Sequence, residues 1–176
     1  NLALFSIILM LLSCASEPAI DTIPGPTQIV RLSDSEIKGL DPQKVSDLSS
    51  LRVAADQFEG LTRLDAKGNA EPGLASEWQI SPDGLTWTFA ATLFPALFQR
   101  LRAPETAAAA KALFGNIVAV AAPDPNRLIV TLASPDPSLP ALLAHPAMAA
   151  LPLHRIRDAG DKWTSDRPMI ASGPYR

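Results

Sequence analysis

The chain has 176 residues, a net charge of −3 and one cysteine, Cys14. The small acidic excess excludes the basic surface by which proteins bind nucleic-acid phosphates, and a single cysteine excludes an internal disulfide. Apolar residues make up 47% of the sequence, enough for the core of one ordinary domain or of two small ones.

The first residues predict an export signal. From Leu2 to Leu12 the chain is apolar except for Ser6, a run of eleven residues. A bilayer-spanning helix needs about 20 residues, whereas the apolar region of a signal peptide needs about 7–15. Small Ser13 before Cys14 suits a lipoprotein signal peptidase, so we predict a signal peptide over residues 1–14 whose cysteine carries lipid. A buried N-terminal helix with an incidental thiol is the alternative.

A tether, a strand and a helix are predicted next. Residues 15–28 contain acidic residues and prolines without apolar periodicity, which is typical of a flexible tether. Residues 29–32 predict a short strand. From Val45 to Leu61 apolar residues recur at intervals of three and four, which predicts a helix. Asp41 is its expected cap, with Pro42 in its first turn.

Turn signals divide the middle of the chain into short elements. Residues 61–64 predict a strand that enters a turn at Gly68, and residues 74–78 predict one helical turn. The run Pro82-Asp83-Gly84 is a strong turn signal between residues that favour β-structure. It predicts a hairpin with arms at residues 78–80 and 85–89.

The second half of the chain alternates helices and strands. An alanine-rich stretch from Phe98 to Phe114 predicts a helix that Pro104 interrupts. The run Pro123-Asp124-Pro125-Asn126 predicts a second hairpin, with arms at residues 117–121 and 128–132. Two short helices are predicted at residues 139–143 and 153–160. This irregular alternation predicts an α+β or α/β fold with a mixed sheet.

Motifs for catalysis are absent from the sequence. It contains no G-x-S-x-G, no H-E-x-x-H, no phosphate-binding loop and no C-x-x-C. The two histidines, His145 and His154, lie on either side of Pro146 and Pro152, and each is predicted to satisfy a local backbone carbonyl. We therefore expect no enzyme, no cofactor and no bound metal.

Aspartates and tryptophans have structural interpretations. Three aspartates stand beside proline or glycine and are predicted to make turns: Asp83, Asp124 and Asp136. Three tryptophans are predicted to pack in the core rather than to stack on a ligand: Trp78, Trp87 and Trp163. Because side chains alternate between the two faces of a strand, Trp87 and Phe89 are expected to share a buried face.

Six motifs of the chain, in this order, resemble those of one bacterial receptor family. They are Asp41-Pro42-Gln43-Lys44, Phe58-Glu59-Gly60-Leu61 with Asp65 to Gly68, Pro72 to Trp78 with Ser81 to Phe89, Leu142 to Pro146, Gly160 to Trp163, and Ser172 to Tyr175. With them the chain resembles the N-terminal part of a family 5 extracellular solute-binding protein. The family comprises the oligopeptide and dipeptide receptors of ABC importers, and the pattern is most similar to the oligopeptide receptors.

The resemblance implies a fold and its division. The family has a type II periplasmic-binding-protein-like fold, in which two α/β lobes close around a cleft and a small mixed α+β domain is inserted in the first lobe. By resemblance, the first lobe begins at residues 29–58, the inserted domain covers residues 59–152, and residues 153–176 return to the first lobe. The chain is then truncated before the second lobe.

The chain also departs from the family pattern. Near residues 90–94 it shortens a strand that the family continues, and we expect this to expose apolar surface near Phe94 and Phe98. The family has an aromatic ligand contact after the position of Pro104, where this chain has Ala107 to Ala110. We therefore expect the chain alone to bind peptides more weakly than a complete receptor.

The function that the resemblance implies is capture of oligopeptides outside the cytoplasm for an ABC importer. Its partners are then a peptide, the permease subunits and, through lipid on Cys14, a membrane of the periplasmic cell envelope. In the family the residues after the first motif contact the ligand, which here are Ser46, Asp47 and Leu48, although Asp47 is equally suited to cap a helix. Alternatives are a receptor for nickel, haem or an opine, an interaction lipoprotein, and a decayed gene product.

Overall fold

The computed structural model describes residues 33–91, 95–165 and 169–173. The predicted signal peptide with Cys14, the tether and the strand at residues 29–32 lie outside these residues. The described residues belong to one compact unit of the chain, and all helices and strands named below lie in it. Within the described residues, no helix combines the length and the apolar character needed to cross a membrane.

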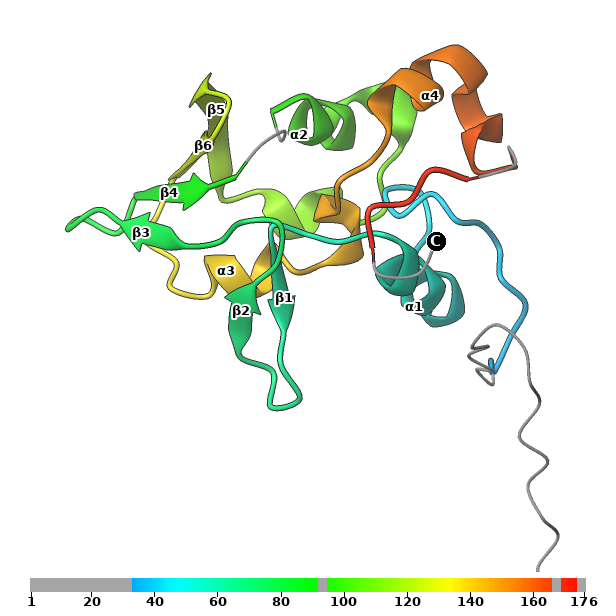
Figure 1. Ribbon diagram of the computed structural model, residues 1–176, viewed down its shortest axis with the longest axis horizontal. Coiled ribbons are helices and arrows are strands. Elements are labelled where there is room, and N and C mark those ends of the chain that lie inside the picture. Colours follow the sequence, from blue (N-terminus) through cyan, green and yellow to red (C-terminus); the bar gives the residue numbers. More distant parts are fainter. Residues whose placement is uncertain (1–32, 92–94, 166–168, 174–176) are drawn as a thin grey trace, which may run out of the picture. The chain divides into compact units, whose positions relative to one another are not determined.

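A four-stranded antiparallel sheet is formed by two hairpins (Figure 1). Its strands lie in the order β3-β4-β6-β5. Their bounds are Trp78–Ile80 for β3, Thr86–Ala90 for β4, Ile117–Asp124 for β5 and Arg127–Leu132 for β6. Both predicted hairpins are confirmed, because β3 pairs with β4 and β5 pairs with β6. Strands β4 and β6 join the two hairpins, with Thr88 opposite Ile129.

A separate antiparallel hairpin consists of β1 (Thr62–Leu64) and β2 (Ala70–Pro72). The predicted strand and its turn are confirmed, and Gly68 in the turn has a φ of +84°, which glycine adopts without strain. Sequence reasoning missed β2, because its residues Ala-Glu-Pro show no alternation of apolar and polar side chains.

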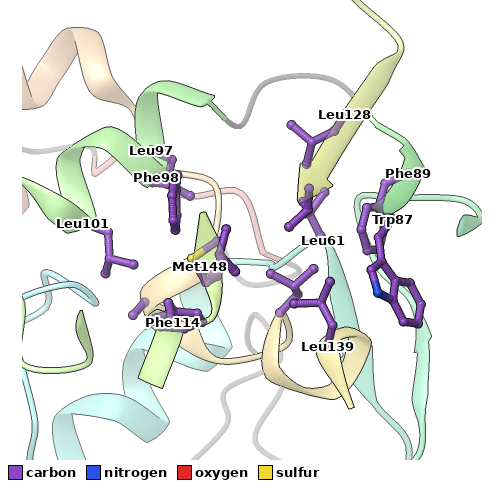
Figure 2. Close-up of a cluster of buried hydrophobic side chains, with 14 of the residues drawn as sticks. Leu61, Trp87, Phe89, Leu97, Phe98, Leu101, Phe114, Leu128, Leu139 and Met148 are labelled. Carbon is purple, nitrogen blue, oxygen red and sulfur yellow. The ribbon is translucent and has the colours of Figure 1, made fainter. Parts of the chain in front are cut away.

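Alternation along β4 and β6 buries one face of the four-stranded sheet. Trp87 and Phe89 of β4 are 5% and 0% exposed. They pack with inward-facing residues of β6 and with α2 (Pro95–Arg102) and α3 (Leu139–Leu142) in one hydrophobic cluster, here called the sheet cluster. Its larger members, labelled in Figure 2, are Leu61, Trp87, Phe89, Leu97, Phe98, Leu101, Phe114, Leu128, Leu139 and Met148.

The expected exposure of apolar surface is wrong for Phe98, while Phe94 lies outside the described residues. Phe98 is 4% exposed because α2 turns it toward the sheet cluster together with Leu97 and Leu101. The guanidinium carbon of Arg102 lies over the Phe98 ring, 5.4 Å from its centre, within range of a cation–π contact.

A smaller hydrophobic cluster joins α1 (Leu48–Gln57) to α4 (Leu153–Ala159) and to η5 (Gly160–Ser165), a 3₁₀ helix. Its buried members, here called the helix cluster, are Ala54, Phe58, Ala149 and Trp163. The rings of Phe58 and Trp163 have centroids 5.7 Å apart. The core predictions for Trp87 and Trp163 are thus confirmed, and Trp78 packs, half-buried, against the sheet cluster.

The helix predicted after Asp41 begins later than expected. The backbone carbonyl of Asp41 accepts hydrogen bonds from the amides of Lys44 and Val45, at 3.0 and 3.1 Å, which closes a turn. Helix α1 starts only at Leu48, with Asp47 as its N-cap. Asp41 does not cap the helix, and its carboxylate is bound by side chains distant in sequence. The apolar pattern that starts at Val45 thus begins before the helix does.

The predicted helical turn at residues 74–78 is wrong. This segment forms bends, because the amides of Leu74 and Ala75 donate to the backbone carbonyls of Gly60 and Leu61, at 3.0 and 2.9 Å. These bonds to another segment replace the bonds that a helical turn would make within itself. Hydrogen bonds to Gly60 and Leu61 therefore decide the conformation here, against the helical preference of residues 74–78.

The alanine-rich stretch at residues 98–114 is more broken than predicted. Helix α2 ends at Arg102, and only short 3₁₀ helices follow, η2 at Pro104–Thr106 and η3 at Lys111–Phe114. Between them Ala107 has a φ of +48°, a left-handed conformation that no α-helix contains. The predicted interruption at Pro104 and the short helices α3 and α4 are confirmed.

Candidate functional site

The segment predicted to contact ligand, Ser46 to Leu48, lies on the surface at the start of α1. Leu48 is 58% exposed, Ser46 is exposed and Asp47 is half-buried. Oδ1 of Asp47 accepts a hydrogen bond from the amide of Ser50 at 2.9 Å. This bond is the main cause that holds the pKa of Asp47 below its usual value, so the carboxylate keeps its charge to lower pH.

Asp47 thus caps the helix, which the sequence offered as an alternative to ligand contact. The role of Asp47 as a ligand contact stays a prediction. A carboxylate accepts hydrogen bonds at both of its oxygens. Capping through Oδ1 and contact with a cationic group through Oδ2 are therefore chemically compatible.

Buried serines hold the downstream end of this segment. Ser49 and Ser50 are 6% and 0% exposed. The hydroxyl of Ser35 donates to Oγ of Ser49 at 3.1 Å, and the amide of Lys38 donates to Oγ of Ser50 at 2.9 Å. The chain before the first motif thus packs against the first turn of α1 and fixes its position.

A buried polar network holds the upstream end. At its centre the carboxylate of Asp41 accepts four hydrogen bonds. Arg100 of α2 donates from Nη2 to Oδ2 at 2.5 Å and from Nη1 to Oδ1 at 3.2 Å, a bidentate ion pair. Nε1 of Trp163 donates to Oδ2 at 3.0 Å, and the amide of Gln43 donates to Oδ1 at 3.1 Å. Asp41 thereby links its own turn to α2 and η5.

Gln43 extends this network, and the four residues Asp41, Gln43, Arg100 and Trp163 are here called the Asp41 network. The side chain of Gln43 is fully buried. Its Nε2 donates to the backbone carbonyls of Leu97 and Ala147, each at 3.1 Å, and its Oε1 accepts from Nη1 of Arg100 at 2.6 Å. The amide group is thus hydrogen-bonded through both its nitrogen and its oxygen, as buried polar groups require.

Sequence reasoning missed this network, although two of the six motifs meet in it. The motif at residues 41–44 supplies Asp41 and Gln43, and the motif at residues 160–163 supplies Trp163. The same two motifs meet again at the surface, where Nζ of Lys44 lies 2.5 Å from Oδ1 of Asp161. Asp41 and Trp163 are 122 residues apart, so no local pattern pairs them.

Two surface pockets lie away from the predicted contact segment. An apolar pocket of about 420 Å³ has a lining that includes Leu97, Leu151, Leu153 and Ile170. A pocket of about 530 Å³ has a lining that includes Phe58, Glu59, Arg63 and Gly173. Among the described residues that line them, neither pocket includes Ser46, Asp47 or Leu48. The predicted contact segment therefore stands outside both pockets.

His145 caps the 3₁₀ helix η4 (Pro146–Met148). Its Nδ1 accepts a hydrogen bond from the amide of Ala147 at 3.1 Å. The ring thus satisfies an amide and not the predicted carbonyl, because the first amides of a helix have no partner within it. Burial lowers the pKa of His145, which favours the neutral, accepting ring. Within the described residues, no group of three or more His, Cys, Asp or Glu side chains is placed to hold a metal ion.

The three aspartates predicted to make turns do so. Asp83 accepts a hydrogen bond from the amide of Leu85 at 3.0 Å. Asp124 and Asp136 accept in the same way from the amides two residues ahead, at 3.0 and 2.9 Å. Each bond is the side-chain mimic of a backbone turn that aspartate favours, and this local role accounts for all three residues.

Individual proteins match the chain, although no family model does. The periplasmic oligopeptide-binding protein OppA of Salmonella typhimurium is 30% identical over 206 residues, which covers 96% of this chain and 38% of the relative. The periplasmic murein peptide-binding protein MppA of Escherichia coli is 30% identical, over 93% of this chain and 36% of the relative. The chain thus spans little more than a third of the length of these curated relatives.

Solved structures share the fold. OppA of Burkholderia pseudomallei matches with a TM-score of 0.73 and 27% identity, over 80% of this chain and 33% of its own. The complex of Haemophilus influenzae OppA with the peptide RPPGFSPFR matches with a TM-score of 0.66 and 26% identity, over 71% of this chain and 30% of its own. The predicted periplasmic-binding-protein-like fold, present here in part, is confirmed.

The match with Salmonella OppA is also informative about insertions. It extends over 206 residues whereas this chain has 176, so the relative carries internal residues that this chain lacks. The expected place of the shortening, near residues 90–94, stays a prediction. Sequence identity along nearly the whole chain and a shared fold agree: the chain belongs to the family of bacterial extracellular solute-binding proteins that includes the periplasmic oligopeptide-binding proteins.

Proposed function

We propose that this chain is part of the solute-binding component of an ABC importer, which captures oligopeptides outside the cytoplasm and delivers them to the permease subunits. The observation that carries the proposal is the 30% identity to an oligopeptide-binding protein over 96% of the chain. A relative of the same fold was solved in complex with a peptide. The relatives are named as periplasmic binding proteins. Their names support a periplasmic location for this protein and a role in binding rather than in catalysis.

Within the chain, we assign peptide contact to Ser46, Asp47 and Leu48. Their exposure on the surface, between two buried anchors, supports the assignment. The ionised carboxylate of Asp47 can accept a charge-assisted hydrogen bond from the terminal ammonium of a peptide. Hydrogen bonds to the peptide backbone, which every peptide offers, would make the recognition tolerant of sequence.

Replacing Asp47 with asparagine removes the charge and keeps the cap, because asparagine caps helices about as well as aspartate. A tripeptide with a free amino terminus is expected to bind Asp47→Asn about tenfold more weakly than wild type, since a bond to a charged group is lost. The N-acetylated tripeptide should bind both proteins equally. Both affinities are measured by NMR titration of the full chain.

The matched control is Asp136→Asn, which alters an aspartate in a turn outside the contact segment. It is expected to change the affinity for neither peptide. An equal loss of affinity for the free and the acetylated tripeptide in Asp47→Asn would contradict the role of the Asp47 charge.

We further propose the division into an inserted domain at residues 59–152 and first-lobe segments at residues 29–58 and 153–176. The two hydrophobic clusters support it. The buried members of the sheet cluster run from Leu61 to Met148. The helix cluster brings Phe58 together with Trp163 and includes only Ala149, near the end of the proposed inserted domain, from residues 59–152. Separate clusters are what two neighbouring cores would form.

We also propose that lipid on Cys14 anchors the protein, on the strength of the apolar run before it. Cells would express the chain from a gene with a start codon and basic residues placed ahead of Asn1, and would be fed labelled palmitate. Wild type is expected to take up the label and Cys14→Ser to lose it, whereas Ser16→Ala should keep it. Equal labelling of wild type and Cys14→Ser would contradict lipid attachment.

A further inference from the structure

We propose that the Asp41 network positions the peptide-contacting segment Ser46 to Leu48, an inference that rests on the proposed function. Asp41 and Trp163 are buried, at 8% and 2% exposure, and the side chain of Arg100 is 13% exposed. These side chains lie below the surface that a peptide would touch. They act on a ligand only through the segment that they hold, and are positioning residues.

The connection from the network to the segment is short. Only Lys44 and Val45 separate Gln43 from Ser46. The amides of both residues donate to the carbonyl of Asp41, at 3.0 and 3.1 Å. Because this turn is closed by hydrogen bonds, a displacement of Asp41 or Gln43 carries over to Ser46.

The hydrogen bonds of the Asp41 network are directional, so they fix the position of the turn at Asp41 and do not merely hold it in contact with its neighbours. The fork of Arg100 on the carboxylate of Asp41 sets both the distance and the plane of the pair. The indole of Trp163 adds a second direction, from η5. Apolar packing is non-directional and would let the turn shift along α2. A segment held in one place loses less freedom when it binds, which favours affinity.

The other end of the segment is fixed independently. Ser49 and Ser50 are buried and are bound by Ser35 and Lys38. The exposed segment therefore spans two buried anchors, and loosening the upstream anchor frees it at that end. Damage to the network should reach the cap between Asp47 and Ser50 while the sheet cluster stays intact.

Arg100→Lys tests this positioning role, because lysine keeps the positive charge and loses the fork. The first readout is hydrogen exchange at the amide of Ser50, which donates to the Asp47 cap, followed by NMR in the full chain at a temperature at which every variant is folded. The second readout is the affinity for a free tripeptide. Val130→Ala is the control, because Val130 is 1% exposed in the sheet cluster and its loss lowers stability without touching the network.

In Arg100→Lys we expect exchange at Ser50 to be about fivefold faster, as for a weakened cap. We expect the dissociation constant of the tripeptide to rise about tenfold, because a segment that is no longer held in place loses more freedom when it binds. Val130→Ala should change neither. Unchanged exchange in Arg100→Lys, or an equal rise in Val130→Ala, would overturn the positioning role. If wild type binds no tripeptide at millimolar concentration while Ser50 responds to Arg100→Lys alone, the peptide contact proposed for Ser46 to Leu48 fails and the anchoring of the segment holds.

Discussion

Replacing Trp87 with alanine is expected to lower the free energy of unfolding by about 3–5 kcal/mol, as for other buried tryptophans. Trp87 is 5% exposed in the sheet cluster, and its ring is stacked with that of Phe89 at a centroid distance of 6.4 Å. Because domains are stable by only about 5–15 kcal/mol in total, the variant should be molten or largely unfolded. Urea denaturation followed by circular dichroism measures the loss.

Two companion variants show whether this loss comes from packing. Ile80 lies opposite Trp87 in the register of the hairpin and is 48% exposed, so Ile80→Ala should cost far less. Within the described residues, Nε1 of Trp87 has no hydrogen-bond partner, so Trp87→Phe loses volume and no bond and should be the milder variant. A Trp87→Ala protein that folds normally and loses only peptide affinity would show that Trp87 contacts ligand.

Arg100→Met is expected to lower the free energy of unfolding by about 3–5 kcal/mol, because it leaves the charge of Asp41 buried without its partner. The two side chains are only 13% and 11% exposed. In the double variant with Asp41→Asn no unpaired charge remains, so much of the loss should be recovered. A double-mutant cycle measured by urea denaturation gives the coupling energy of the pair.

The exposed pair of Arg63 and Glu71 is the control for this cycle. Its atoms Nε and Oε1 lie 2.8 Å apart, but the side chains are 62% and 41% exposed. Exposed ion pairs contribute about 0–1 kcal/mol, so Arg63→Met and Glu71→Gln should show little coupling. A coupling energy equally small for Asp41 and Arg100 would mean that the buried pair is not an anchor.

Elements that depend on short-range chemistry could be predicted from the sequence. The hairpin of β3 and β4 could be predicted from its turn, in which Gly84 has a φ of +73° and Asp83 accepts a hydrogen bond from the amide of Leu85. Both conditions are set by residues within the turn itself. The turn between β5 and β6 meets only the second of these conditions, because Asp124 accepts a hydrogen bond from the amide of Asn126.

Elements that depend on distant partners could not be predicted. Asp41 has the sequence context of a helix cap, but Arg100, 59 residues away, binds its carboxylate, and α1 begins at Leu48 instead. Gln43 finds its backbone partners 54 and 104 residues away. The predicted contact residues came from family resemblance, and the anchors that hold them could be seen only in three dimensions.

Contact between a peptide and Ser46 to Leu48 can be observed by titrating the isotope-labelled full chain with a free tripeptide and following each residue by NMR. We expect the largest chemical-shift changes at Ser46, Asp47 and Leu48. We also expect a dissociation constant near millimolar, since about half of the roughly 8 kcal/mol of a micromolar complex would remain. Shifts that spare this segment and gather at the apolar pocket around Leu151 and Ile170 would contradict this contact.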